Sequence, residues 1–123
     1  MRKLAVLAIA LAPAVAGAEY TIEKGTSWDC SKDPVVRLGG GKQKIKFTGQ
    51  CKTIRVDHNK NVLDIESVDE LHVGGTVNTI DVGTVGAIDF RGDKNVVRWK
   101  KVKTGDKPAV RDKGRGNAVL QAK

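Results

Sequence analysis

The chain has 123 residues, of which 40% are hydrophobic, with a formal net charge of +8. This length allows one small domain and excludes two, and no apolar run is long enough to span a membrane as a helix. The two cysteines and two distant histidines lack the spacing typical of a zinc site.

The first 18 residues have the pattern of a secretory signal peptide. Arg2 and Lys3 precede the short apolar run Leu4–Ala12, and Ala16-Gly17-Ala18 is a small-x-small cleavage site. We therefore expect cleavage between Ala18 and Glu19 and export of a soluble, periplasmic or extracellular protein. Without Arg2 and Lys3, 20 basic and 14 acidic side chains leave a net charge of +6. Although this charge is basic, an exported protein rarely meets nucleic acid, so we do not expect it to bind any. The sequence also indicates no cofactor and no metal.

The mature chain divides into a short cap and a repeat domain. Residues 19–32 are expected to form an N-terminal cap with one short strand, and residues 33–123 a β-repeat domain. Between Cys51 and Lys101 the sequence repeats every 17 residues, and a fixed period of this kind indicates a repeat architecture. The three units are CKTIRVDHNKNVLDIES, VDELHVGGTVNTIDVGT and VGAIDFRGDKNVVRWKK.

Two further stretches continue the pattern less regularly. Residues 33–50 repeat it with one extra residue, so that Val36 and Leu38 align with Ile54 and Val56. After Lys101 a five-residue insertion precedes a partial unit, residues 110–121. Atypical units at the two ends are expected of repeat proteins.

Each unit alternates apolar and polar residues in two short runs, such as Ile54-x-Val56 and Leu63-x-Ile65. This period is typical of half-buried strands, and polar turn residues separate the runs. We predict an all-β fold in which each unit is strand, turn, strand, turn. A small parallel β-solenoid with 17-residue coils is favoured over an antiparallel meander or sandwich. The reason is that equivalent positions of successive units, which we call a column, keep the same apolar or polar character.

One polar column supports the solenoid. Asn61, Asn78 and Asn95 align, and Asn117 continues the column in the last unit. Stacked asparagines can form an amide ladder, although a turn residue repeated for local reasons would give the same pattern. The solenoid also predicts a Cys30–Cys51 disulfide, because adjacent coils bring these residues close and an even pair in an exported protein indicates a bond.

Cys30, Cys51, the recurring strand–turn–Asn–strand units and the final Gly116-Asn117-Ala118-Val119 resemble the exported bacterial proteins grouped as domain of unknown function 3060. The resemblance covers roughly residues 30–120. It implies an exported β-repeat domain without a known activity, and it assigns no functional residue. The turns differ from the family pattern, because residues 57–60 and 91–94 are more charged here.

No motif specifies a reaction. Gly39-Gly40-Gly41-Lys42 lacks the glycine spacing and the following helix of a phosphate loop, and Arg91-Gly92-Asp93 occupies an ordinary turn of the repeat. His72 and Asp89 are expected to form a surface pair rather than a catalytic one. The paired carboxylates Asp64 and Asp81 allow a small hydrolase as an alternative, but we expect a non-catalytic structural or binding module.

Charge is distributed unevenly along the repeat. Residues 57–90 contain one basic and seven acidic side chains, whereas residues 91–115 contain ten basic and three acidic ones. The basic segment predicts a pole that binds an anionic envelope polymer, which makes a polyanion- or carbohydrate-binding module the first alternative function; a protein partner is also open. Equally, basic residues at an open end can block edge-to-edge pairing. The candidate residues are Arg98, Lys100, Lys101, Lys103, Lys107, Arg111, Lys113 and Arg115.

Overall fold

The computed structural model describes residues 19–122, so the proposed signal peptide lies outside the described residues. Nine strands and no helix make up the described part. The strands are β1 (Tyr20–Ile22), β2 (Ser27–Asp29), β3 (Val35–Leu38), β4 (Lys44–Val56), β5 (Val62–Val73), β6 (Thr79–Phe90), β7 (Val96–Val102), β8 (Ala109–Asp112) and β9 (Ala118–Gln121). Within residues 19–122, therefore, no helix is available that could cross a membrane.

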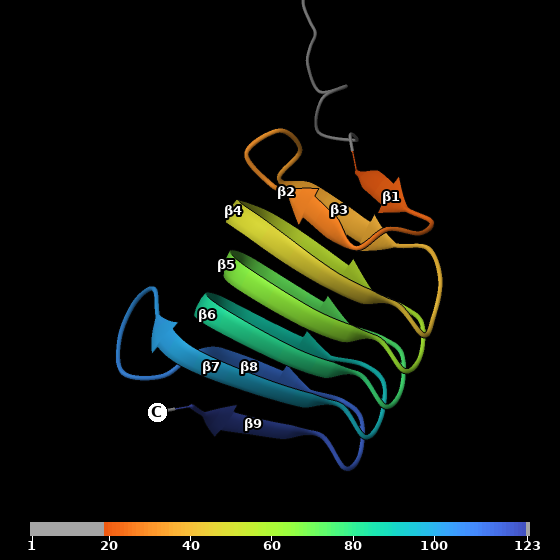
Figure 1. Cartoon of the computed structure of the whole chain (residues 1–123). Coiled ribbons are helices and arrows are strands. Elements are labelled where there is room, and N and C mark those ends of the chain that lie inside the picture. The colour runs from red at the N-terminus through yellow and green to blue at the C-terminus, as the bar shows by residue number, and fades with distance from the viewer. Residues whose placement is uncertain (1–18, 123) are drawn as a thin grey trace, which may run out of the picture.

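The chain is a parallel β-solenoid of about five coils (Figure 1). All eight strand pairings are parallel, and β4, β5, β6 and β7 stack in chain order. Leu63 pairs with Ile80 and Ile80 with Val97, which is the 17-residue register of the repeat. The solenoid prediction is confirmed. The antiparallel alternative is wrong, because a parallel ladder needs a long return connection, which the rest of each coil supplies.

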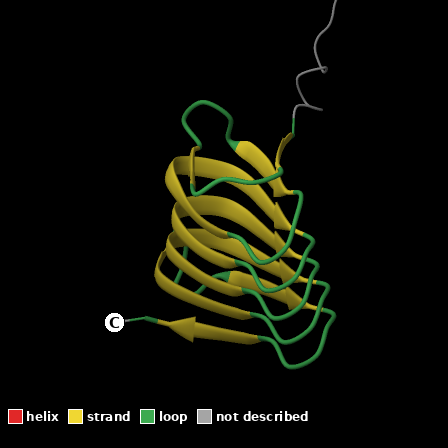
Figure 2. Cartoon of the chain, turned by 45° about the vertical axis from the view of Figure 1, so that its right-hand side comes forward, coloured by secondary structure: helices red, strands yellow, loops and turns green. Residues whose placement is uncertain are grey.

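Each coil has two walls, a corner and a turn edge (Figure 2). In β5, residues 62–65 belong to the first wall and residues 68–73 to the second wall, and residues 66–67 form the corner between them. The turn edge, residues 74–78 in this coil, leads back to the first wall. The prediction of a second turn in each unit is wrong, because the strand continues through the corner. Ser67 pairs with Thr84, and β5 runs unbroken from Val62 to Val73.

At and just after the corner, glycine lets neighbouring coils approach closely. A Cβ atom at Gly83 would lie 2.5 Å from the carbonyl oxygen of Glu66, and one at Gly86 would lie 2.5 Å from that of Asp69. Both contacts are far too short for a side chain. Here glycine therefore marks close backbone contact rather than a break in the strand.

The core fills the space between the two walls. Leu63, Ile65, Leu71 and Val73 are almost completely buried, as are their equivalents in the neighbouring coils. The core also has a fifth column of buried residues, which the alternation of apolar and polar residues did not predict. It contains Cys51, Val68 and Val85. It begins the second wall directly after the corner, where the strict alternation is interrupted.

The asparagine column forms the predicted amide ladder. Asn61 N donates to Oδ1 of Asn78 at 2.9 Å, Asn78 N donates to Oδ1 of Asn95 at 2.9 Å, and Asn95 N donates to Oδ1 of Asn117 at 2.9 Å. Gln43 N begins the ladder by donating to Asn61 Oδ1 at 3.0 Å. Asn61, Asn78 and Asn95 are buried, so these bonds satisfy backbone N–H groups that water cannot reach.

The residue before each ladder position has a left-handed backbone. The φ angles are 57° at Lys42, 60° at Lys60, 56° at Val77 and 58° at Lys94, and Gly116 has φ of 72°. Glycine adopts this conformation without a steric penalty, whereas a β-branched residue such as valine is an outlier there. The turn edge therefore contains four strained positions, of which Val77 is the most unfavourable.

The N-terminal segment contains two short strands, not the single strand predicted. β1 pairs with β3, and β2 pairs with β4, so residues 20–29 form an incomplete first coil. The predicted disulfide is present and joins Cys30 to Cys51, with a Cα–Cα distance of 5.0 Å. The extra residue of the unit at residues 33–50 lies where the pairing register of β4 with β5 shifts, between Phe47 and Gln50. Gly49, within this shift, has φ of 82°.

The C-terminal end of the solenoid is open. The five-residue insertion lies between β7 and β8, because Ala87 pairs with Ala109 instead of a residue 17 positions later. In the described part of the chain, β8 pairs only with β6, and β9 pairs only with β7. Both strands are consequently edge strands. Val110 and Leu120, in these strands, are 46% and 51% exposed.

Candidate functional site

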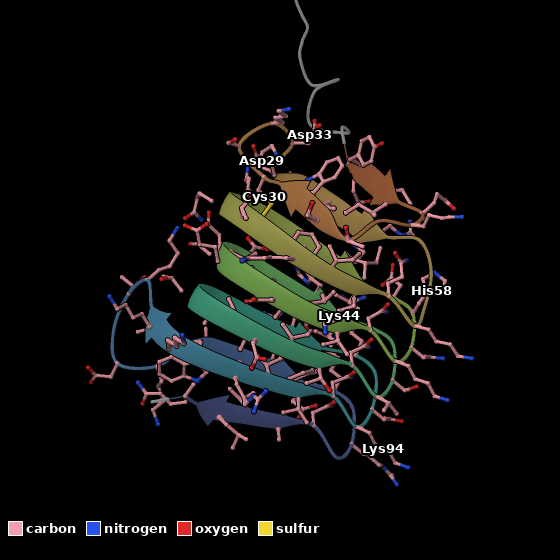
Figure 3. The ribbon with its side chains drawn as sticks, viewed as in Figure 1. Asp29, Cys30, Asp33, Lys44, His58 and Lys94 are labelled. Atoms are coloured by element: carbon pink, nitrogen blue, oxygen red, sulfur yellow. A yellow bond between two sulfur atoms is a disulfide. The ribbon has the colours of Figure 1, made fainter. Side chains whose placement is uncertain are left out.

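The eight predicted basic residues surround the last coil rather than gathering on one face. Arg98 lies on the first wall, Lys100 and Lys101 lie at the corner, and Lys103 follows β7. Arg111 lies on β8, and three residues lie in loops: Lys107 in the insertion, and Lys113 and Arg115 in the turn edge after β8. All eight are exposed. Their positions define the basic last coil, which is the C-terminal end of the molecule in Figure 3.

Two members of the basic last coil are held by carboxylates of earlier coils. Arg98 Nε donates to Asp81 Oδ1 at 2.7 Å, and Nη2 donates to Oδ2 at 3.1 Å. Lys103 Nζ pairs with Asp69 Oδ1, although Asp69 is two coils away. Gly86 occupies the intervening position and has no side chain to block the lysine.

The other six members make no ion pair. Within residues 19–122, no carboxylate lies within 4.0 Å of the charged atoms of Lys100, Lys101, Lys107, Arg111, Lys113 or Arg115. Two of the three carboxylates of this segment accept local backbone hydrogen bonds instead. Asp93 Oδ1 accepts from Arg115 N at 2.9 Å, and Asp112 Oδ1 accepts from Gly114 N at 3.0 Å. The last coil therefore presents unneutralised positive charge to solvent.

Two carboxylates lie side by side on the outer face of the first wall. Asp64 and Asp81 are register neighbours, as expected. Lys46 is the register neighbour of Asp64 but forms no ion pair with it among the described residues. Both oxygens of Asp81 accept hydrogen bonds from Arg98, so a substrate shared with Asp64 would have to displace this exposed ion pair.

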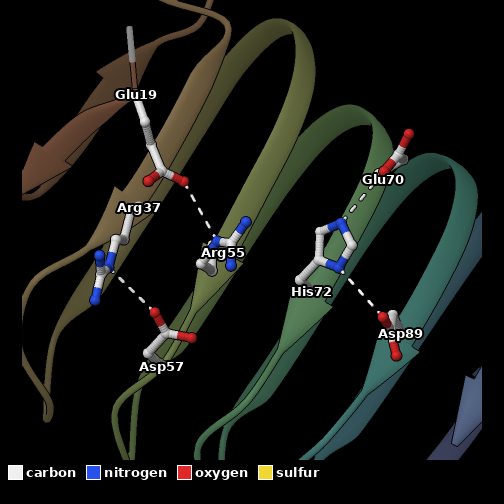
Figure 4. Close-up of polar contacts among 7 residues, drawn as sticks. All are labelled: Glu19, Arg37, Arg55, Asp57, Glu70, His72 and Asp89. Atoms are coloured by element: carbon white, nitrogen blue, oxygen red, sulfur yellow. Dashed lines mark hydrogen bonds and ion pairs between the residues drawn. The ribbon is translucent and has the colours of Figure 1, made fainter. Parts of the chain in front are cut away.

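A polar column runs along the outside of the second wall (Figure 4). Arg55 Nε lies 3.3 Å from Glu19 Oε2, and Arg37 Nε lies 3.1 Å from Asp57 Oδ2. His72 continues the column. Such exposed pairs contribute little to stability, at most about 1 kcal/mol each. They are diagonal contacts: Arg37 reaches Asp57, two residues beyond its register neighbour Arg55.

His72 lies between two carboxylates. Its Nδ1 atom is 3.4 Å from Asp89 Oδ2, as the predicted surface pair required, and its Nε2 atom is 3.2 Å from Glu70 Oε1. The Glu70 contact was missed because the two residues are two positions apart on one strand, a spacing that carries no strong signal. Asp89 is more buried than a surface pair implies, at 9% exposed, and its Oδ1 has no hydrogen-bond partner in the described part of the chain.

One carboxyl group near the disulfide has a shifted pKa. The hydroxyl of Ser31 donates to Asp29 Oδ1 at 2.6 Å, and the backbone N–H of Ser31 donates to the same atom at 3.0 Å. These bonds hold the pKa of Asp29 below its usual value. Asp29 thus remains ionised as part of the tight turn that precedes β3, close to Cys30 (Figure 3).

Residues 69–116 match the family described as "Protein of unknown function (DUF3060)". The match extends from the second wall of β5 to the turn edge before β9 and therefore includes all eight residues of the basic last coil. It confirms the resemblance over this segment, and the family description names no activity. Searches of curated proteins and of solved structures found no matching protein.

Proposed function

We propose that this protein is an exported, non-catalytic binding module whose basic last coil holds an anionic polymer of the cell envelope. The observation that carries the proposal is the absence of ion pairs at six of the eight basic residues of that coil, within residues 19–122. Unneutralised charge at one end of a molecule attracts a polyanion over distances of about the Debye length, roughly 8–10 Å at physiological salt.

Export is part of the same proposal. The signal-like N-terminus supports it, and the Cys30–Cys51 disulfide is compatible with an oxidising compartment. N-terminal sequencing of the exported protein should begin at Glu19. A mature protein that still begins at Met1 would contradict cleavage after Ala18.

A structural role is the second candidate, and the open end of the solenoid favours it. β8 and β9 are edge strands, and lysine or arginine near an edge prevents two molecules from pairing their strands. In this case the basic last coil would keep the protein monomeric and would need no ligand. A small hydrolase that uses Asp64 and Asp81 has less support, since Arg98 occupies Asp81.

The experiment that separates the first two candidates replaces Lys100, Lys101 and Lys107 by glutamine. Lys103 is left unchanged because it pairs with Asp69. The readouts are retention on a polygalacturonate matrix and molar mass by light scattering. A binding coil predicts weaker retention of a protein that stays monomeric, whereas edge protection predicts self-association with unchanged retention.

The matched control is a second triple variant with the same change of charge. Lys24, Lys32 and Lys52 are exposed, make no ion pair among the described residues and lie in the N-terminal half of the solenoid. Their replacement by glutamine should leave retention close to that of the original protein. Equal losses in both triple variants would show that net charge alone determines retention, and the proposal for the last coil would then be wrong.

A further inference from the structure

The outer face of the second wall has a hollow near the C-terminal end. Its volume is about 360 Å³, within the range of small-ligand sites. The hollow forms because one outward column changes from long to short side chains, from Glu70 to Ala87 and Ala109. The two alanines make a small apolar floor, and the polar side chains of β5, β6 and β8 line the rim. The rim residues are Glu70, His72, Asp89 and Arg111.

Asp89 is an unusual member of this rim. It is 9% exposed, and one of its carboxylate oxygens, Oδ1, is closed to solvent and lacks a hydrogen-bond partner in residues 19–122. The other oxygen lies 3.4 Å from His72 Nδ1 and 3.9 Å from Arg91 Nε. A buried carboxylate that uses only part of its accepting capacity is costly, so a rotation of the Asp89 side chain that brought Oδ1 to a donor in the hollow would be favourable.

The arrangement of the rim argues against ions as the ligand. Glu70 and Asp89 contact opposite nitrogens of the His72 ring (Figure 4), so the three side chains do not converge on one point. No group of three potential metal ligands occurs in the described part of the chain. An anionic ligand, in turn, would face two carboxylates. The rim instead provides hydrogen-bond acceptors on Glu70 and Asp89 and donors on Arg111.

Arg111 is placed to act together with Asp89. The two residues are register neighbours on β8 and β6, and Arg111 has no ion-pair partner within residues 19–122. A hydroxyl group both donates and accepts hydrogen bonds, so neighbouring hydroxyls on one ligand could donate to the carboxylates and accept from the guanidinium. The C–H face of a sugar ring would then cover the alanine floor.

We propose that this hollow binds one uncharged sugar residue through adjacent hydroxyl groups. The site shares Arg111 with the basic last coil but none of the lysines that are replaced in the polymer test. Binding should depend little on salt, because the ligand carries no charge. The proposal does not require that an anionic polymer binds elsewhere.

The test is an NMR titration of the uniformly ¹⁵N-labelled protein with glucose, galactose, mannose and N-acetylglucosamine. We expect chemical-shift changes confined to the amides of Ala87, Asp89, Ala109 and Arg111 for at least one sugar, and no loss of the changes in added salt. Replacing Ala87 by leucine should fill the hollow and abolish them, and Asp89→Asn should weaken binding about tenfold by removing a charged acceptor.

Ala118→Leu is the matched control, because Ala118 also faces outward but on the first wall, next to Val96. It should leave the titration unchanged, and the same spectra report whether each variant is folded. The proposal is overturned if none of the four sugars shifts these amides, or if the shifts persist in Ala87→Leu. A response to putrescine in place of sugars would assign the carboxylates to a cation and would also overturn it. None of these outcomes affects the lysine variants, so the polymer proposal is judged separately.

Discussion

At the scale of single residues, buried amides hold the coils in register. Asn95 makes four hydrogen bonds through its side chain: Oδ1 accepts from Asn78 N and Asn78 Nδ2, and Nδ2 donates to Gly75 O and Asn117 Oδ1, all at 2.9–3.1 Å. Its removal leaves several buried polar groups without partners. We expect Asn95→Ala to lower the free energy of unfolding by about 3 kcal/mol, measured by urea denaturation.

Asn59→Ala is the control for this prediction. Asn59 is exposed and accepts one bond, from Thr76 N at 2.8 Å, so its loss should be about 1 kcal/mol. If both variants lost the same free energy, burial of the ladder would not be the source of its stability.

A substitution of Val77 is expected to stabilise the protein. Its φ of 56° places a β-branched side chain in the left-handed region, which disfavours L-residues by about 1–2 kcal/mol but which asparagine tolerates better. Val77→Asn should therefore raise the free energy of unfolding, by about 1 kcal/mol. Val62 is similarly exposed, at 43% against 48%, but lies in a strand, so Val62→Asn should be neutral or destabilising. Stabilisation of both variants would point to surface polarity rather than backbone strain as the cause.

At the scale of elements, alternation along the strands separates core from surface. Ile80 is fully buried in the central coil, and Thr79, one residue earlier, faces outward and is half-buried. Ile80→Ala should cost about 2–5 kcal/mol, because it removes packed methyl groups and leaves a cavity. Thr79→Ala should cost far less. Thermal or urea denaturation of the two variants gives the comparison, and similar losses would be incompatible with the observed strand faces.

The elements also show which features the sequence could predict. Strand pairing was predictable because a 17-residue period repeats whole columns, and the asparagine ladder and Cys30–Cys51 followed from the same stacking. The corner was not, because Glu66-Ser67 resembles a turn, while the close approach at Gly83 depends on the neighbouring coil. Likewise, nothing local in the sequence indicates the left-handed backbone of Val77.

The candidate site was only partly predictable, because several of its features depend on contacts between neighbouring coils. The segment that contains unpaired basic residues could be found by counting charges. The contact from Lys103 to Asp69 depends on reaching over Gly86. The hollow beside Asp89 requires three coils and an insertion to be in place. These features arise between coils, so a pattern within one unit does not contain them.

At the scale of the whole molecule, the two ends differ. The N-terminal end also finishes in edge strands, β1 and β2, but there the rings of Tyr20 and Trp28 lie 4.4 Å apart, and the disulfide ties the incomplete first coil to β4. The C-terminal end is open and carries the basic last coil. This asymmetry is the basis of the central functional claim, which is that an anionic polymer contacts the molecule at one end and not along its acidic middle coils.

The most direct measurement of that claim is amide chemical-shift mapping with polygalacturonate at low and high salt. The account predicts changes concentrated in residues 100–115, with little change in residues 62–78, and their loss as salt screens the charges. Changes concentrated in the middle coils, or no change at any amide at low salt, would contradict the assignment of the basic last coil as the binding site.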